Sequence, residues 1–256
     1  MKFINKSEEP QKLRDYRQKH PNNQWEQFRN ECQTGLDEVY KTLKRDQGGI
    51  CAYCEIKIQE TDRQVEHFHD KSDKSDPNNP MRWHLDWNNL LYCCKGGTQK
   101  NNSGNNFLAA SNVDISCGEH KKFGEYQNIL SPLEIPMFPR IFSYEISEGS
   151  IWIRVDEKLC LQAGIDKTRA EQTIKVLNLN CKRLREARYS VMKQINFSLW
   201  ARQHTNPDTN QDQVKKLIIR LIGNKDSWGQ FFTMIRHRFN DVVEKYLHEI
   251  QDEGNL

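Results

Sequence analysis

The sequence predicts an α+β fold, in which a centre rich in cysteine and histidine lies between an N-terminal helical segment and a mostly helical C-terminal half. Three observations support this prediction. Apolar residues recur at three- and four-residue steps before residue 47 and after residue 165, as they do in amphipathic helices. Between residues 50 and 124 this period is lost, and Cys, His, Asn and Gly become frequent. Residues 140–156 alternate between apolar and polar side chains, which predicts a β-hairpin.

The N-terminal segment, residues 1–49, is expected to contain one helix over residues 10–46. Its apolar residues form a single stripe, as in a helix that packs on one side. The stripe consists of Trp25, Phe28, Cys32, Leu36, Val39, Tyr40 and Leu43. Gly48-Gly49 follows the last of these residues and is expected to end the helix.

The central segment, residues 50–125, begins with Cys51-Ala-Tyr-Cys54, whose two thiols are spaced to bind one tetrahedral ion. A redox motif is the other interpretation of this spacing, but the thioredoxin-like βαβ context that it needs is absent. Further ligands would come from Cys93, Cys94 and Cys117, of which the adjacent pair is expected to supply one. The sequence therefore predicts a zinc site, with four unconnected thiols as the alternative. Residues 95–106 are expected to form a Gly/Asn-rich loop.

The remainder divides into a hairpin and linker, residues 126–164, and a helical C-terminal domain, residues 165–256. A Glu148-Gly149 turn is expected between the hairpin strands. The last helix is expected to carry a broad apolar set: Trp228, Phe231, Phe232, Ile235, Phe239, Val242, Val243, Tyr246, Leu247 and Ile250. This set is either part of the core or a docking face.

Residues 165–202 contain nine Lys/Arg and three Asp/Glu, and the basic residues are densest at Lys182, Arg183, Arg185 and Arg188. Such a stretch either neutralises nucleic-acid phosphates or is a solvated helix face. The sequence leaves both interpretations open.

Composition excludes several classes of protein. The chain has 256 residues, of which 36% are hydrophobic and 29% charged, and no apolar run reaches the ~18 residues of a transmembrane helix. The first residues lack the apolar region of a signal peptide, so a cytoplasmic location is expected, where the eight cysteines would not form disulfides. The net charge of +3 is too small to indicate a partner.

Four motifs follow one another in the central segment: Cys51-Ala-Tyr-Cys54-Glu55, Glu66-His67, Trp87-Asn88-Asn89-Leu90, and Cys117-Gly-Glu-His120-Lys121. Over residues 45–125 this order resembles the zinc-clipped HNH endonucleases. It is most similar to the HNH family of retron and Septu-type antiphage operons, the PtuB-like proteins. The resemblance implies a ββα-metal unit, in which a hairpin holds the acid-His pair and the Asn and a helix carries the last His.

The resemblance also implies roles for individual residues. Glu66 and His120 would bind a catalytic Mg²⁺ or Mn²⁺, and His67 would act as the general base. Asn89 would orient His67 or the phosphate. His69 could assist the metal or bind phosphate, since it lies two residues beyond His67 and could share its face.

Structural zinc would be held by Cys51, Cys54, Cys94 and Cys117. Cys94 is preferred to Cys93 because HNH spacing places the third cysteine five residues after the Asn of the Asn-Leu pair. The sequence departs from the common pattern after this point. Twenty-two residues separate Cys94 from Cys117, and His120 lies three residues past Cys117 instead of directly after it.

By resemblance, the expected function is that of a metal-dependent endonuclease, the effector of an antiphage complex, which cuts DNA or structured RNA such as tRNA. The family implies an ABC/SMC-like ATPase as partner, and in retrons a reverse transcriptase with its noncoding RNA and msDNA. The alternative is a non-catalytic, zinc-stabilised scaffold that binds the ATPase. A scaffold would need none of Glu66, His67 and Asn89, so their joint presence favours the nuclease.

Overall fold

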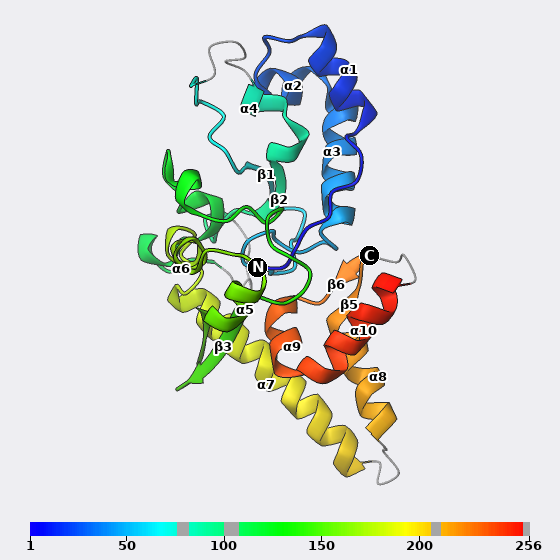
Figure 1. The fold of residues 1–256 in the computed structure, drawn as a ribbon. Coiled ribbons are helices and arrows are strands. Elements are labelled where there is room, and N and C mark those ends of the chain that lie inside the picture. The colour runs from blue at the N-terminus through cyan, green and yellow to red at the C-terminus, as the bar shows by residue number, and fades with distance from the viewer. Residues whose placement is uncertain (76–81, 100–107, 206–210, 253–256) are drawn as a thin grey trace.

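A computed structural model describes residues 1–75, 82–99, 108–205 and 211–252, and its fold is a mixture of helices and short antiparallel sheets, as predicted (Figure 1). Part of the expected Gly/Asn-rich loop, residues 100–106, lies outside these ranges. The α-helices are α1 (Gln11–Lys19), α2 (Trp25–Glu31), α3 (Gln33–Asp46), α4 (Arg82–Leu85), α5 (Glu157–Gln162), α6 (Lys167–Val176), α7 (Lys182–Thr205), α8 (Gln211–Ile222), α9 (Phe232–Arg238) and α10 (Asn240–Asp252). The 3-10 helices are η1 (Trp87–Asn89), η2 (Asn112–Asp114), η3 (Cys117–Glu119) and η4 (Glu125–Asn128). None of the described helices combines the length and apolar character of a membrane span.

Within the described residues, the strands pair into three two-stranded antiparallel sheets. They are β1 (Arg63–His67) with β2 (Leu90–Cys94), β3 (Phe142–Ser147) with β4 (Ser150–Val155), and β5 (Gly223–Asn224) with β6 (Ser227–Trp228). The β3–β4 hairpin confirms the alternating pattern, and it turns at Glu148 and Gly149, both with positive φ.

The single N-terminal helix expected over residues 10–46 is wrong, because the chain forms α1, α2 and α3 instead. Proline disfavours helical backbone in the residue before it, and Pro21 follows His20, which has φ −133° and ψ 65°. Cys32 interrupts the segment again with φ −125°. The predicted stop at Gly48-Gly49 is confirmed, since both residues have positive φ, which glycine adopts without strain.

The single last helix is also wrong. Trp228 lies on β6, Phe231 precedes α9 in the left-handed region with φ 55°, and Phe239 separates α9 from α10. Trp228, Phe231 and Phe232 are at most 2% exposed, so the core interpretation of the apolar set is confirmed for these residues.

The C-terminal half packs directly on the central segment. The amides of Trp228 and Phe231 donate to the carbonyls of Gly48 and Glu55, at 3.0 and 2.8 Å. The buried carboxylate of Glu55 accepts from the amide of Thr233 at 2.8 Å. The residues around the first cysteine pair are thus fixed by contacts from far along the chain.

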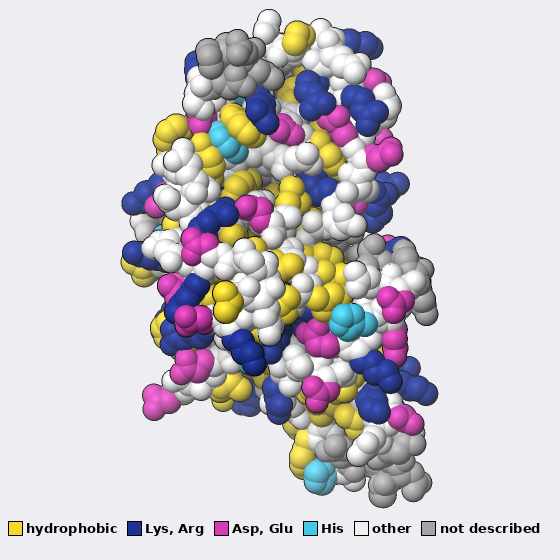
Figure 2. All heavy atoms as spheres, viewed as in Figure 1, with side chains coloured by type: hydrophobic (Ala, Val, Ile, Leu, Met, Phe, Trp, Pro, Cys, Tyr) yellow, Lys and Arg dark blue, Asp and Glu magenta, His cyan; other side chains and the backbone are white. Residues whose placement is uncertain are grey.

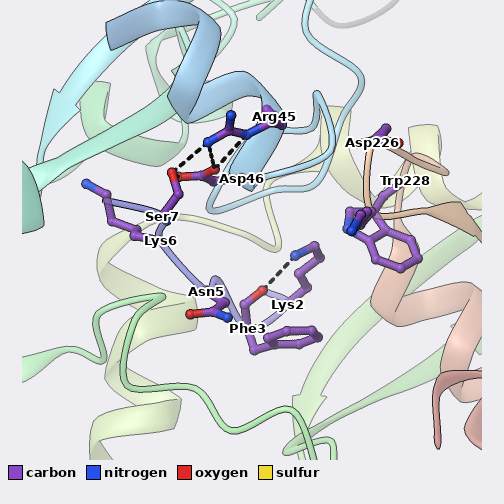
Figure 3. A pocket seen from close by; sticks show the side chains of 10 residues that line it. Lys2, Phe3, Asn5, Lys6, Ser7, Arg45, Asp46, Asp226 and Trp228 are labelled. Atoms are coloured by element: carbon purple, nitrogen blue, oxygen red, sulfur yellow. Dashed lines mark hydrogen bonds and ion pairs between the residues drawn. The ribbon is translucent and has the colours of Figure 1, made fainter. Parts of the chain in front are cut away.

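The N-terminal residues pass between the end of α3 and the β5–β6 turn, where they border a cavity of about 320 Å³ (Figure 3). Arg45 donates to the Ser7 hydroxyl at 2.7 Å on one side, and Trp228 lies opposite. From the same stretch, the Lys6 ammonium donates to the carbonyls of Trp87 and Leu90. Lys6 therefore braces the turn that precedes β2.

Candidate metal centre and active site

Four buried cysteines converge on one point beneath the β1–β2 sheet: Cys51, Cys54, Cys94 and Cys117. Their sulfur atoms all lie within 4.8 Å of one another, and three of the pairs are separated by 3.7–3.9 Å. Four sulfurs placed tetrahedrally at the ~2.3 Å of a Zn–S bond would be about 3.8 Å apart. The cluster thus has the dimensions of a tetrahedral metal site.

Each cysteine reaches the cluster from a different local structure. Cys51 and Cys54 lie in a tight turn closed by a β-bridge between Ile50 and Lys57. Cys94 is the last residue of β2. Cys117 opens η3 with φ 61°, an uncommon backbone for a non-glycine residue, and its amide donates to Leu177 O at 2.8 Å.

Cys93 is buried but lies outside this group of sulfurs. Successive side chains of a strand point to opposite faces, so Cys94 and Cys93 diverge at the end of β2. The pKa of Cys93 is raised well above its usual value, first by burial. Its environment is that of a packed neutral thiol.

Two arginines of the basic stretch at 182–188 are buried and support the packing around this centre, whereas Lys182 is exposed. Arg183 is 6% exposed and donates to Gly96 O at 3.1 Å and to the Ser116 hydroxyl at 2.6 Å. Arg188 is 2% exposed and donates to the carbonyls of Ile151 and Leu179. The phosphate-binding interpretation is therefore wrong for these two arginines.

Glu66 lies on β1 opposite Leu91, with its carboxylate turned toward the segment that contains η3. Its Oε1 atom pairs with the Lys121 ammonium at 2.8 Å, and both side chains are nearly buried. Burial raises the pKa of Glu66, and Lys121 partly offsets this effect. A Cβ atom on Gly118 would lie 2.2 Å from Glu66 Oε2, so the carboxylate occupies space that only glycine leaves open.

His67 ends β1 and points away from Glu66, as adjacent strand residues do. Its Nε2 atom lies 3.0 Å from the His84 carbonyl, and its ring meets Trp25 edge-on at 5.2 Å. A carbonyl can only accept, so Nε2 carries the proton and Nδ1 keeps a lone pair. Burial lowers the pKa of His67 to about 3. The imidazole is therefore neutral at physiological pH.

Asn89 does not touch the His67 ring through any of its hydrogen bonds. Its side chain accepts from the His69 amide at 2.6 Å and donates to the carbonyls of His69 and Trp83, at 3.0 and 2.7 Å. The Asn89 side chain thus links the chain after β1 to Trp83. Trp83 precedes His84, and the His84 carbonyl accepts from the His67 ring.

His69 is placed by stacking. Its ring lies 3.6 Å from that of Trp83 and 3.8 Å from that of Tyr126, and Nε2 is 3.5 Å from Asp73. These contacts occupy both faces and one edge of the ring.

His120 follows η3, and its Nδ1 donates to Val176 O at 2.8 Å, which leaves the Nε2 lone pair available. The helix expected to carry His120 is wrong: the described residues around it form 3-10 turns. Positive φ at Cys117 and at Gly124 brackets the segment and is incompatible with a continuous helix.

Lys121 is the functional candidate that the sequence analysis missed. Besides the ion pair with Glu66, its ammonium donates to the carbonyls of His67 and Phe68, at 2.8 and 2.7 Å. The signal was present as the His120-Lys121 pair, but a lone lysine in a sequence is indistinguishable from a solvated one.

A scan against models of protein families finds no match. Among curated proteins, the chain is similar to one from Escherichia coli named "Retron Ec83 putative HNH endonuclease". The two are 38% identical over 220 residues, which cover 77% of this chain and 81% of the relative.

Proposed function

The chain belongs to the HNH endonucleases of retrons, and we propose that it hydrolyses phosphodiester bonds of nucleic acid as the effector of an antiviral defence complex. The observation that carries this proposal is the junction of β1 with the segment from Gly118 to Lys121. Glu66 contacts both ends of that segment, which supports the assignment of His120, the residue between them, to the same site.

We assign structural zinc to Cys51, Cys54, Cys94 and Cys117. Their sulfur spacing suits Zn²⁺, their burial suits a closed structural site, and soft thiolate ligands favour this ion. Zinc would join β2 to η3 across the 22 intervening residues and so hold the Gly118–Lys121 segment beside β1.

Glu66 and His120 are the residues that would hold a divalent Mg²⁺ or Mn²⁺. The space beside Gly118 already accommodates a carboxylate, and the Val176 carbonyl holds His120 Nδ1, so Nε2 is the atom that would bind the ion. When bound, such an ion stabilises the charge that develops on the phosphate and the leaving oxygen.

His67 is the proposed general base; it stands at the end of β1, where side chains from the two faces of the strand can still reach one phosphate. The His84 carbonyl fixes the proton on Nε2, so Nδ1 is the atom that accepts a proton from attacking water. Asn89 positions His67 and the His84 carbonyl indirectly, because it binds the backbone of His69 and of Trp83, which lie close to them in the chain. The proposed substrate is DNA or a structured RNA such as tRNA. The proposed partners are an ABC/SMC-like ATPase and a reverse transcriptase with its noncoding RNA and msDNA, and the proposed location is the cytoplasm.

Cleavage by a His67→Ala variant tests the proposal. The protein, purified with the partners of its operon, is incubated with labelled DNA and with total RNA in the presence of Mg²⁺. Loss of the base should slow cleavage by about 10²–10⁴-fold. His20→Ala, which removes an exposed histidine at the end of α1, is the matched control and should cleave normally.

Wild-type rates in His67→Ala would remove this residue from the mechanism. A wild-type complex that assembles but cleaves nothing would favour the alternative, a zinc-stabilised scaffold.

A further inference from the structure

Helix α7 extends away from the cysteine cluster and carries large exposed rings along its length (Figure 1). Phe197 is 66% exposed, Trp200 is 54% exposed and Tyr189 is 36% exposed. Together with Lys193 and His204 they recur every three or four residues, so all five lie on one face of the helix. We call these five residues the aromatic stripe. The buried residues of α7, such as Leu184 and Ile195, face the other way.

The rings of the aromatic stripe already lie one above the next. Phe197 and Trp200 have centroids 5.9 Å apart, and Trp200 and His204 have centroids 4.5 Å apart, each pair inclined by only 28°. His204 is fixed in this position because its Nδ1 donates to Trp200 O at 2.8 Å. The stripe is thus an ordered ladder of flat π surfaces open to solvent.

Its surroundings are positively charged. Residues 187–222 contain six Lys/Arg and two Asp/Glu, and α7 has no acidic residue beyond Glu186. Lys193 lies within the stripe, and Lys216 and Arg220 are exposed on α8, as is Lys215, whose ammonium lies 3.8 Å from Asp212. Figure 2 shows hydrophobic and histidine side chains at the lower end of the molecule, with Lys and Arg side chains nearby and a few Asp and Glu side chains among them.

The chemistry of the stripe favours a nucleic acid over an apolar protein surface. Exposed Ser190, Gln194, Asn196 and Ser198 flank the rings, so the face lacks the continuous apolar area of a protein interface. Rings combined with an excess of cations over carboxylates suit single-stranded nucleic acids, because bases stack on the rings and the cations neutralise phosphates.

We propose that the aromatic stripe binds single-stranded nucleic acid, with bases stacked on Phe197 and Trp200 and phosphates near Lys193 and the basic residues of α8. This inference rests on the proposed nuclease function in one respect: the stripe would be a second contact for nucleic acid, the proposed substrate. Trp200 lies about 25 Å along the helix axis from Arg183, which contacts the cysteine centre. The stripe is therefore separate from the catalytic residues, while one rigid helix connects the two.

Binding is measured by fluorescence anisotropy with a labelled, unstructured 30-nucleotide single strand, as RNA and as DNA. The full chain carries His67→Ala, so that cleavage does not contribute. Replacing Phe197 and Trp200 by Ala should weaken binding at least about 5-fold for each ring. Leu161→Ala, at an 83% exposed position on α5, is the matched control and should bind normally.

Two further variants separate stacking and charge from general apolar contact. Trp200→Phe should retain most of the affinity, whereas Trp200→Leu, which keeps apolar area but loses the π face, should weaken binding as Ala does. Lys193→Gln should reduce the slope of log affinity against log salt by about 0.7, the value for one phosphate contact on a single strand.

Equal affinity of the double alanine variant and the control would overturn the proposal, as would undiminished binding by Trp200→Leu. A wild-type chain that self-associates through the stripe, and loses this association in the double variant, would also overturn it in favour of an interface between copies. Because the assay is independent of cleavage, absent nuclease activity would refute the proposed function and leave this result standing.

Discussion

Gly118 is the residue whose change gives the sharpest test of the catalytic arrangement. Its φ is not positive, so alanine fits the backbone, but the new Cβ would lie 2.2 Å from Glu66 Oε2 and 2.5 Å from Cδ. Ordinary contacts begin at 3.4 Å, so the carboxylate has to retreat by at least about 1 Å. A displacement of this size at a catalytic group can lower the rate by about 10²-fold. We therefore expect Gly118→Ala to lose about this much cleavage activity while it retains one zinc ion per chain.

A double-mutant cycle with Glu66→Ala shows whether the loss passes through the carboxylate. Removing the Glu66 side chain also removes the clash, so Gly118→Ala should have little further effect on cleavage in that background. Rates are measured with one labelled substrate, and zinc is quantified by mass spectrometry of the metal. Additive losses would refute the reasoning, and so would a fully active Gly118→Ala enzyme.

Three further predictions concern the supports of the site. Cys94→Ser should lower bound zinc well below one ion per chain and Cys93→Ser should not, since only Cys94 lies in the sulfur cluster; metal analysis giving the reverse would contradict the assignment. Arg183→Met should lower the free energy of unfolding by about 2–4 kcal/mol in urea titrations, because it leaves the buried acceptors of Gly96 and Ser116 without this donor. The control Lys182→Met, at an exposed position, should change this free energy by less than about 0.5 kcal/mol. Burial lowers the pKa of Lys6 to about 7, so above that pH the unfolded chain binds one more proton than the native one. Between pH 7 and 10 the stability of the wild type should then rise relative to Lys6→Met by up to about 1.4 kcal/mol per pH unit, and a difference independent of pH would contradict this.

The fold was predictable where a single local rule decides the structure. Alternation gave the β3–β4 hairpin, and Gly48-Gly49 gave the end of α3, because period and positive φ are properties of a few neighbouring residues. The breaks inside the long helical patterns were not predictable from periodicity. At Cys32 and Phe239 the apolar spacing continues across the break, and the pattern is the same whether one helix or two present it.

The candidate site was predictable as a set of residue types and not as a set of contacts. The sulfur cluster is the group that spacing selected, and Glu66 and His67 stand at the end of a strand paired with the one that follows Asn89. The sequence could not predict the role of a residue whose contacts are made with residues far away in the chain. Lys121 acquires its importance only when folding buries its ammonium against Glu66.

The arginines of α7 show why charge alone misled. In a sequence, Arg183 and Lys182 count equally toward a basic stretch, yet the structure buries the first and exposes the second. Burial of a guanidinium is costly unless it is compensated, and here carbonyls, a hydroxyl and nearby thiols compensate it.

Although burial acts to lower the pKa of Arg183, the sulfurs, Cys54 foremost, raise it overall. With the proposed Zn²⁺ bound, four thiolates would leave two negative charges, and the Arg183 guanidinium from the C-terminal half would partly offset them. The hydrogen bond from the Cys117 amide to the Leu177 carbonyl is a second contact between the C-terminal half and the cysteine cluster. The helical half therefore supports the cysteine cluster, and a truncation near residue 165 is expected to destabilise the cluster together with the helices.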